Sequence, residues 1–360
     1  MTPGRAKNLD HNQPRPSLKV AIKWLLVGIL AIVFLTVATW ITWSEKNPET
    51  ERELRIQVRE QLTDWFPEEM ALPDELIGFI PRSEHFDEHN PPEVVLLHGL
   101  DEPGGIWDEL VPALDEAGFN GWEFRYPNDQ AIDRSTDLLA EYWPQLPADK
   151  PLVLVGHSMG GLIIRDFVSR WRHPVGQPPQ VAGPEVAGVI LVGTPNQGSD
   201  WARLRVWLEL REMIADIPAG RFSLFAGLRD GTGAAKIDLR PDSEFLAELN
   251  DRPWPEQIPI RVIGGLIGEP TPAMLDSIQA LGDEIDNREL AERFENWWSE
   301  TSDQMGDGAV PVESLQLEQA PPPLVLNASH RGLLVTMPLS EGEPPAIAPI
   351  IEILRDWQPH

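Results

Sequence analysis

The residues best suited to chemistry form the segment GHSMG at residues 156–160, with Ser158 at its centre. It follows the apolar run 152–155, typical of a strand buried on both faces, and precedes residues 161–168, whose apolar spacing is helical. A serine at a sharp strand-to-helix turn presents its Oγ with a helix N-terminus behind it, which suits nucleophilic attack on a carbonyl carbon. A tightly packed glycine-rich turn or a phosphate-binding turn has a similar composition and is the alternative.

Such a serine needs a rigid frame, and the surrounding sequence alternates between strand and helix patterns. This alternation predicts an α/β fold with a mostly parallel sheet and helices on both of its faces. The loops after parallel strands collect at one edge of the sheet, where α/β proteins bind their ligands. The predicted strands are 94–97, 121–126, 152–155, 185–192, 259–265 and 324–326, and the predicted helices are 104–118, 132–146, 161–168 and 346–357.

The composition limits the classes of protein and site to be considered. At 360 residues and 42% hydrophobic content, the chain is long enough for one large α/β core with additions. It has no cysteine, which excludes disulfides, thiolate zinc sites and cysteine nucleophiles. The net charge of −28 argues against nucleic acid and anionic lipid as partners of the main domain.

The first 44 residues differ from the rest in charge and hydropathy. Residues 24–44 contain no charged side chain and are about as long as a membrane-spanning helix; basic residues precede them and acidic ones follow. This asymmetry predicts a basic cytoplasmic tail over residues 1–23, an anchor over 24–44 and an extracytoplasmic remainder, periplasmic in a Gram-negative cell. A cleaved signal peptide is the alternative, but its apolar core is normally shorter, so the sequence favours an uncleaved anchor.

Residues 45–90 form a charged connector punctuated by prolines. Part of it has the pattern of a short amphipathic helix, because four apolar side chains recur on one helical face. They are Leu54, Val58, Leu62 and Trp65. Such a helix either lies on lipid or packs against the main domain, and the sequence leaves both possibilities open.

Four motifs in the main part of the chain occur in the order found in one known family. They are LLHGL at 96–100, GHSMGG at 156–161, VGTPNQGS at 192–199 and GDGAVPVES at 306–314, which a histidine follows. Together they resemble the α/β-hydrolase fold, most closely its bacterial lipase and carboxylesterase branch, including the PGAP1-like esterases. The resemblance covers roughly residues 92–358 and implies a hydrolase domain over residues 91–360.

The resemblance implies a triad in the chain order Ser158, acid, histidine. His330, in the segment NASHRG after the last predicted strand, stands where the family has its histidine. His173 is about one helix beyond the serine, on the wrong side of the sheet, and His360 is the last residue. We therefore expect His330 to be the general base.

The acid implied by the resemblance is Asp307. It lies in GDGAVP at 306–311, which matches the acid turn of the family, and its flanking glycines let the carboxylate reach an imidazole. Asp283 and Asp303 are rival carboxylates in the same loop-rich region.

The resemblance and the geometry of a helix N-terminus together imply an oxyanion hole formed by the backbone N–H groups of Leu100 and Met159. His98 and His157 stand near these groups in the sequence. We expect both imidazoles to bind loop backbone rather than to transfer protons.

Between residues 199 and 258 the alternation of strands and helices is interrupted by an insertion rich in apolar residues. A helical cap above the serine would supply an apolar acyl pocket and exclude water. An ordinary packed helix pair without gating is the alternative.

These expectations combine into a membrane-anchored serine ester hydrolase. Ser158 attacks an ester carbonyl, His330 acts as general base and then as general acid, and Asp307 holds the imidazole tautomer. We expect no metal and no organic cofactor; the partners are an ester or lipid substrate and, through the N-terminal helix, the membrane, while the oligomeric state is undetermined. The alternatives are a phospholipase, thioesterase or acyltransferase on the same triad, and a catalytically silent anchored binding module.

Overall fold

The computed structural model describes most of the chain. The described residues are 18–73, 76–84, 90–100, 105–200, 231–268, 275, 277–281, 289, 293–294, 296–298, 305–337 and 342–357. The chain divides between Pro48 and Glu49 into two units, which are described separately.

The described part of the first unit is the helix α1 (Leu18–Lys46). Its segment Ile22–Lys46 has a mean hydropathy of 2.5 and is long and apolar enough to cross a membrane. Large apolar side chains such as Trp24, Ile32 and Phe34 are exposed along it. The chain therefore has one N-terminal helix of the length and composition of a membrane span or a signal sequence.

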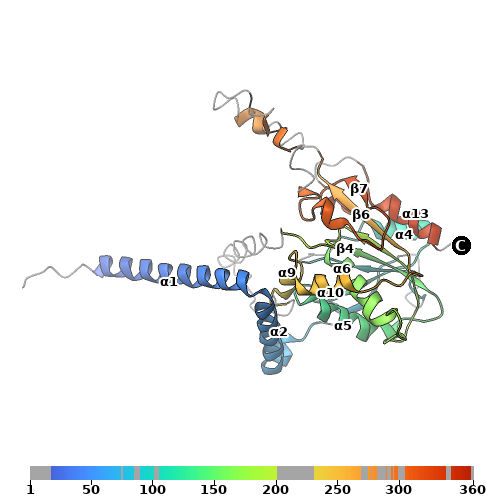
Figure 1. Ribbon diagram of the computed structural model, residues 1–360, viewed down its shortest axis with the longest axis horizontal. Coiled ribbons are helices and arrows are strands. Elements are labelled where there is room, and N and C mark those ends of the chain that lie inside the picture. Colours follow the sequence, from blue (N-terminus) through green and yellow to red (C-terminus); the bar gives the residue numbers. More distant parts are fainter. Residues whose placement is uncertain are drawn as a thin grey trace, which may run out of the picture. The chain divides into compact units, whose positions relative to one another are not determined.

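Within the described residues, seven strands of the second unit form one sheet in the order β1-β3-β2-β4-β5-β6-β7. Its strands β6 and β7 lie side by side in Figure 1. All neighbouring pairs are parallel except β1 with β3, so the predicted α/β class is confirmed. The strands are β1 (Gly78–Pro81), β2 (Val94–Leu97), β3 (Gly121–Arg125), β4 (Leu152–His157), β5 (Val186–Val192), β6 (Ile260–Leu266) and β7 (Leu324–Asn327).

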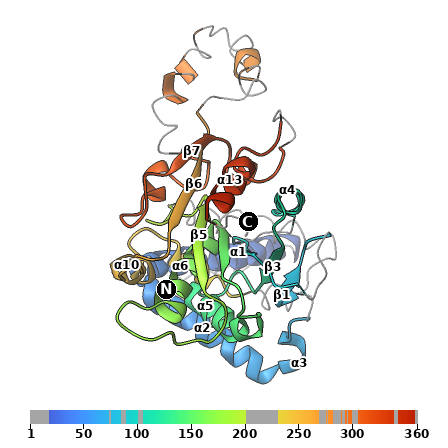
Figure 2. The ribbon, with the colours of Figure 1, turned by 90° about the vertical axis from the view of Figure 1, so that its right-hand side faces the viewer.

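Helices cover both faces of this sheet, as Figure 2 shows for α4 and α13 on one side. The predicted helix 104–118 is shorter than expected, because residues 106–109 form turns before α4 begins. The helices of the second unit are α2 (Pro48–Trp65), α3 (Pro67–Met70), α4 (Leu110–Ala117), α5 (Ile132–Tyr142), α6 (Met159–Asp166), α9 (Ala234–Asp238), α10 (Glu244–Asp251) and α13 (Ile347–Trp357). A π-helix over Phe167–Arg172 continues α6, and short 3-10 helices span Trp143–Gln145, Val312–Leu315 and Arg331–Leu333.

The sheet lies between two apolar layers, and alternate side chains of β2 belong to one layer or the other. Val95 and Leu97 belong to the apolar cluster that also contains residues of α5 and α6. Val94 and Leu96 belong to the cluster that contains residues of α4 and α13. Successive side chains of a strand point to opposite faces, and all four are completely buried. The strand therefore reads as a continuous apolar run in the sequence.

The connector helix α2 packs against the rest of the second unit, but through its charged side. Arg52 lies 2.5 Å from Asp238 Oδ1 and 2.9 Å from Asp133 Oδ1, and Glu51 is buried. Arg55 pairs with Glu51 at 2.7 Å and also donates to the carbonyl of Thr232. The structure thus decides that the helix docks on the domain, and it does so without its apolar face.

The ion pair between Arg52 and Asp238 leads to a prediction: removing Arg52 should destabilise the fold by an amount that depends on pH. Burial raises the pKa of Asp238 to about 6, while the Arg52 charge opposes that rise. A group with a raised folded-state pKa stabilises the fold at low pH and loses that contribution as the pH rises through the folded-state pKa. Arg52→Met raises the pKa of Asp238 further, so we expect the free energy of unfolding to fall by about 3–5 kcal/mol at pH 8 and by less at pH 5.

Urea unfolding of the full chain at the two pH values measures this difference. Arg134→Met is the matched control, because its ion pair with Glu60 is exposed on both sides, at 50% and 61% of the side-chain areas. We expect the control to cost less than about 1 kcal/mol, without a pH trend. An equal loss at both pH values for Arg52→Met would contradict the assignment of the effect to Asp238.

Candidate active site

Ser158 is the single residue between the end of β4 and the start of α6, at the sharp turn that the motif predicted. Its backbone has φ 54° and ψ −126°. Among the described residues, only Ser158 and Asp242 are non-glycine residues with a positive φ. That conformation is strained for a non-glycine residue, and such strain is common at catalytic turns. A Cβ added to Gly160 would lie 2.2 Å from the carbonyl oxygen of Leu97, so glycine is required there for the turn to approach β2.

The predicted acid and base are in direct contact. His330 Nδ1 lies 2.8 Å from Asp307 Oδ2, and the backbone N–H of His330 donates to the Asp307 carbonyl at 2.8 Å. The other carboxylate oxygen, Oδ1, accepts the N–H groups of Ala309 at 2.9 Å and Val310 at 2.8 Å. The Asp307 side chain is fully buried and held by three donors, so its carboxylate has one orientation.

The end of β5 brings the imidazole of His330 close to the serine. The Ser158 N–H donates to the carbonyl of Val192 at 2.8 Å, and a Cβ on Gly193 would lie 3.1 Å from the His330 ring. Between these described residues there is no hydrogen bond from Ser158 Oγ to the imidazole. Nucleophile–base contacts are often long in ligand-free serine hydrolases and tighten when substrate binds. The ends of β4 and β5 therefore bring Ser158, His330 and Asp307, the three predicted triad residues, to one edge of the sheet.

The loop after β2 lies directly against the serine. A Cβ on Gly99 would be 2.8 Å from Ser158 Cβ, and Leu100 is buried one residue later. Met159 is the first residue of α6, where backbone N–H groups have no partner within the helix. Both predicted oxyanion donors therefore belong to segments that meet at Ser158.

Tyr126, which the sequence analysis did not single out, supports this loop. Its ring stacks on His98 with centroids 4.4 Å apart and planes 8° from parallel, and its hydroxyl donates to the His98 carbonyl. His98 Nδ1 lies 3.0 Å from the Gly99 carbonyl. The only signal in the sequence was that Tyr126 is the last residue of a predicted strand, at its carboxyl end.

His157 binds the backbone of the predicted general base. Its Nε2 lies 3.2 Å from the His330 carbonyl oxygen, and the two rings are 4.7 Å apart between centroids. Burial lowers the pKa of His157 well below its ordinary value, and the neighbouring His330 and Arg331 charges lower it further. His157 is therefore neutral, and because a carbonyl only accepts, the proton is on Nε2. This matches the expected backbone-binding role, although its partner could not be inferred from the sequence.

A buried polar network lies behind α6. Arg165 Nη1 donates to Asn196 Oδ1 at 3.1 Å, and Asn196 Nδ2 donates to the carbonyl of Leu315 at 3.0 Å. Arg165 Nη2 also donates to Asn250 Oδ1 at 2.7 Å. The network ties the helix behind Ser158 to the VGTPNQGS segment and to the 3-10 helix that follows the acid turn.

The other residues and segments considered in the sequence lie elsewhere or outside the described residues. His173 accepts the N–H of Val186 at 3.3 Å, at the amino end of β5 and so at the opposite edge of the sheet from Ser158. Asp283, Asp303 and His360 lie outside the described residues, as does half of the predicted cap, residues 201–230. No group of three or more metal-binding side chains gathers among the residues that the structure describes.

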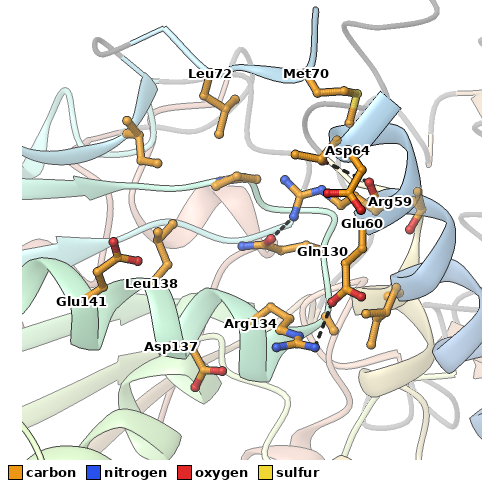
Figure 3. A pocket seen from close by; sticks show the side chains of 17 residues that line it. Arg59, Glu60, Asp64, Met70, Leu72, Gln130, Arg134, Asp137, Leu138 and Glu141 are labelled. Atoms are coloured by element: carbon orange, nitrogen blue, oxygen red, sulfur yellow. Dashed lines mark hydrogen bonds and ion pairs between the residues drawn. The ribbon is translucent and has the colours of Figure 1, made fainter. Parts of the chain in front are cut away.

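A cleft of about 480 Å³ lies between α2 and α5, apart from the serine (Figure 3). In Figure 3, Arg59 reaches Gln130 and Glu60 faces Arg134 across it. Its apolar wall includes Ile56, Met70, Leu72, Ile77 and Leu138. None of the triad candidates lines this cleft.

A profile of the Alpha/beta hydrolase family matches residues 94–340, the stretch that contains all these side chains. The chain belongs to this family. The fold predicted from the four motifs is therefore confirmed, and hydrolase chemistry is the activity of the class.

Solved structures that resemble this α/β hydrolase are distant in sequence. A mature lipase of Bacillus licheniformis is 16% identical, with a TM-score of 0.46, over 77% of this chain and 97% of that one. Phospholipase PlaB from Legionella pneumophila is 17% identical, with a TM-score of 0.48, over 73% of this chain and 60% of that one. A type II thioesterase, YbtT of a yersiniabactin pathway, is 16% identical, with a TM-score of 0.43, over 78% and 97%. No curated protein sequence matches the chain.

Proposed function

We propose that this α/β hydrolase is a membrane-anchored serine ester hydrolase with Ser158, His330 and Asp307 as its triad. The observation that carries the proposal is the Nδ1–carboxylate contact of 2.8 Å beside a serine in strained backbone. Because the contact engages Nδ1, the free Nε2 is the ring nitrogen able to accept a proton from the serine.

In the proposed reaction the Ser158 Oγ attacks the ester carbonyl carbon while His330 Nε2 takes its proton. The carbonyl oxygen becomes an oxyanion, which the N–H groups of Leu100 and Met159 stabilise. The tetrahedral intermediate collapses, the imidazolium returns its proton to the departing alkoxide, and an acyl-enzyme remains. His330 then deprotonates a water, which attacks the acyl carbon and regenerates the serine.

Membrane attachment by α1 is the second part of the proposal. The length and hydropathy of Ile22–Lys46 support it, and the basic residues before that segment favour an extracytoplasmic catalytic unit. In a Gram-negative cell this location is the periplasm. The substrate is then an ester that reaches the membrane surface, and lipids are the natural candidates.

Labelling of the full chain with a fluorophosphonate probe tests the proposed function without knowledge of the substrate. We expect one covalent adduct, located by peptide mass at Ser158, with labelling slowed by a competing ester. A series of acyl esters and thioesters of increasing chain length then distinguishes esterase, phospholipase and thioesterase activities. A folded chain that forms no adduct would be a silent binding module rather than a hydrolase.

A further inference from the structure

The helix α2 has its polarity reversed relative to an ordinary surface helix. Its predicted apolar stripe, defined as Leu54, Val58, Leu62 and Trp65, recurs at helical spacing and so shares one face. Trp65 is 67% exposed, Val58 43% and Leu54 39%. Amphipathic helices of globular proteins normally turn such a face toward the core. Leu62 is half-buried, and the other three side chains of the apolar stripe face away from the domain on which the helix is docked.

The docking contacts prevent the helix from turning about its axis. Arg52 is held by Asp238 and Asp133, and Arg55 donates to the carbonyl of Thr232, so both arginines are bound to residues outside the helix. Rotating the apolar stripe inward would break these pairs and leave Asp238, which has no exposed area, without its counterion. The outward orientation of the stripe is therefore a fixed property of the catalytic unit.

The position of α2 in the chain identifies what covers the stripe. The candidate membrane span ends at Lys46 and α2 begins at Pro48, so the helix starts where the chain would leave a bilayer. Leucine, valine and tryptophan on one face, next to Phe66 at 39% exposure, suit the boundary between headgroups and acyl chains. The exposed remainder of the helix carries Glu53, Gln57, Glu60 and Asp64, which favour water.

We propose that the apolar stripe of α2 lies in the interfacial layer of a bilayer of zwitterionic lipid. The inference rests on the proposed anchoring by α1. The exposed acidic residues give the helix no attraction to anionic headgroups, so insertion of apolar area drives the contact. Because α2 is bound to the start of α5 and to Thr232 and Asp238, the contact holds the catalytic unit in one orientation to the lipid that supplies its substrate.

Single-cysteine labelling tests the proposal cleanly, because the natural chain has no cysteine. The variants Val58→Cys, on the stripe, and Gln57→Cys, on the polar side, are labelled with an environment-sensitive fluorophore in the full chain. The labelled chains are reconstituted into phosphatidylcholine vesicles. For Val58→Cys we expect about twofold or greater quenching by a nitroxide-bearing lipid and protection from aqueous iodide. Gln57→Cys should show the reverse.

Each remaining outcome overturns the proposal in a recognisable way. Equal access of iodide to both labels would mean that the stripe lies in water. Protection of Val58→Cys from both quenchers would mean that protein covers it instead of lipid. Carbonate extraction distinguishes failure of the α1 anchor from failure of the inference about α2. Release of the chain from the vesicles refutes the anchor. Retention of a chain whose Val58→Cys label is exposed to water refutes only the inference about α2. Fluorophosphonate labelling of both variants verifies that they are folded.

Discussion

Replacing Ser158 by alanine lowers kcat on a short p-nitrophenyl ester by about a million-fold, because the members of a catalytic triad act as a unit. Without Oγ no acyl-enzyme forms. His330, although still oriented by Asp307, then has no serine proton to accept at Nε2. What remains is the contribution of the oxyanion donors and substrate binding, typically about a thousandfold or more over water.

The measurement needs a control for folding, since Ser158 occupies strained backbone at φ 54°. Alanine is as strained there as serine, so we expect the urea midpoint of Ser158→Ala to stay close to that of the unmodified chain. Full turnover by a correctly folded Ser158→Ala chain would refute the nucleophile and, with it, the proposed mechanism.

Asp307→Asn is expected to lower kcat by about ten thousand-fold. Oδ1 of Asp307 accepts two backbone N–H groups, so the amide oxygen of asparagine must take that position. The amide NH₂ then faces His330 Nδ1, which has to become the acceptor. The imidazole proton moves to Nε2, and a protonated Nε2 cannot take the proton of Ser158.

Steady-state kinetics and the rate of fluorophosphonate labelling should fall together in this variant, because both need a basic Nε2. Asp251→Asn is the matched control: Asp251 is exposed at the end of α10, and its change should leave kcat within about twofold of the unmodified chain. Activity of Asp307→Asn within about tenfold of the unmodified chain would place the catalytic acid elsewhere. Asp283 and Asp303 are then the next candidates.

Much of the sheet could be predicted because its central strands are buried on both faces. A strand such as β2 is then an uninterrupted apolar run, which is visible without knowledge of its neighbours. The edge strand β1 was missed. It has four residues, ends in Pro81 and gains its identity only from antiparallel pairing with β3.

In the candidate site, too, the local features could be predicted from the sequence, whereas the contacts between distant residues could not. The strand, the serine and the helix of the elbow are consecutive in the chain, so their local pattern predicts their geometry. Asp307 and His330 are 23 residues apart, and their contact followed only from the family resemblance. The support given by Tyr126 to His98 and by His157 to His330 depends on side chains from different strands meeting at one edge, which no spacing predicts.

The helix α2 shows most clearly what each level determines. The sequence by itself determined that four apolar side chains share one helical face, because helical periodicity is a local property. It also determined that this helix follows an apolar segment long enough to span a bilayer. Only the tertiary structure decided which face meets the domain, since that depends on Asp133 and Asp238, far along the chain. Their ion pairs with Arg52 hold the charged face of α2 against the domain, and the apolar stripe is therefore left facing outward.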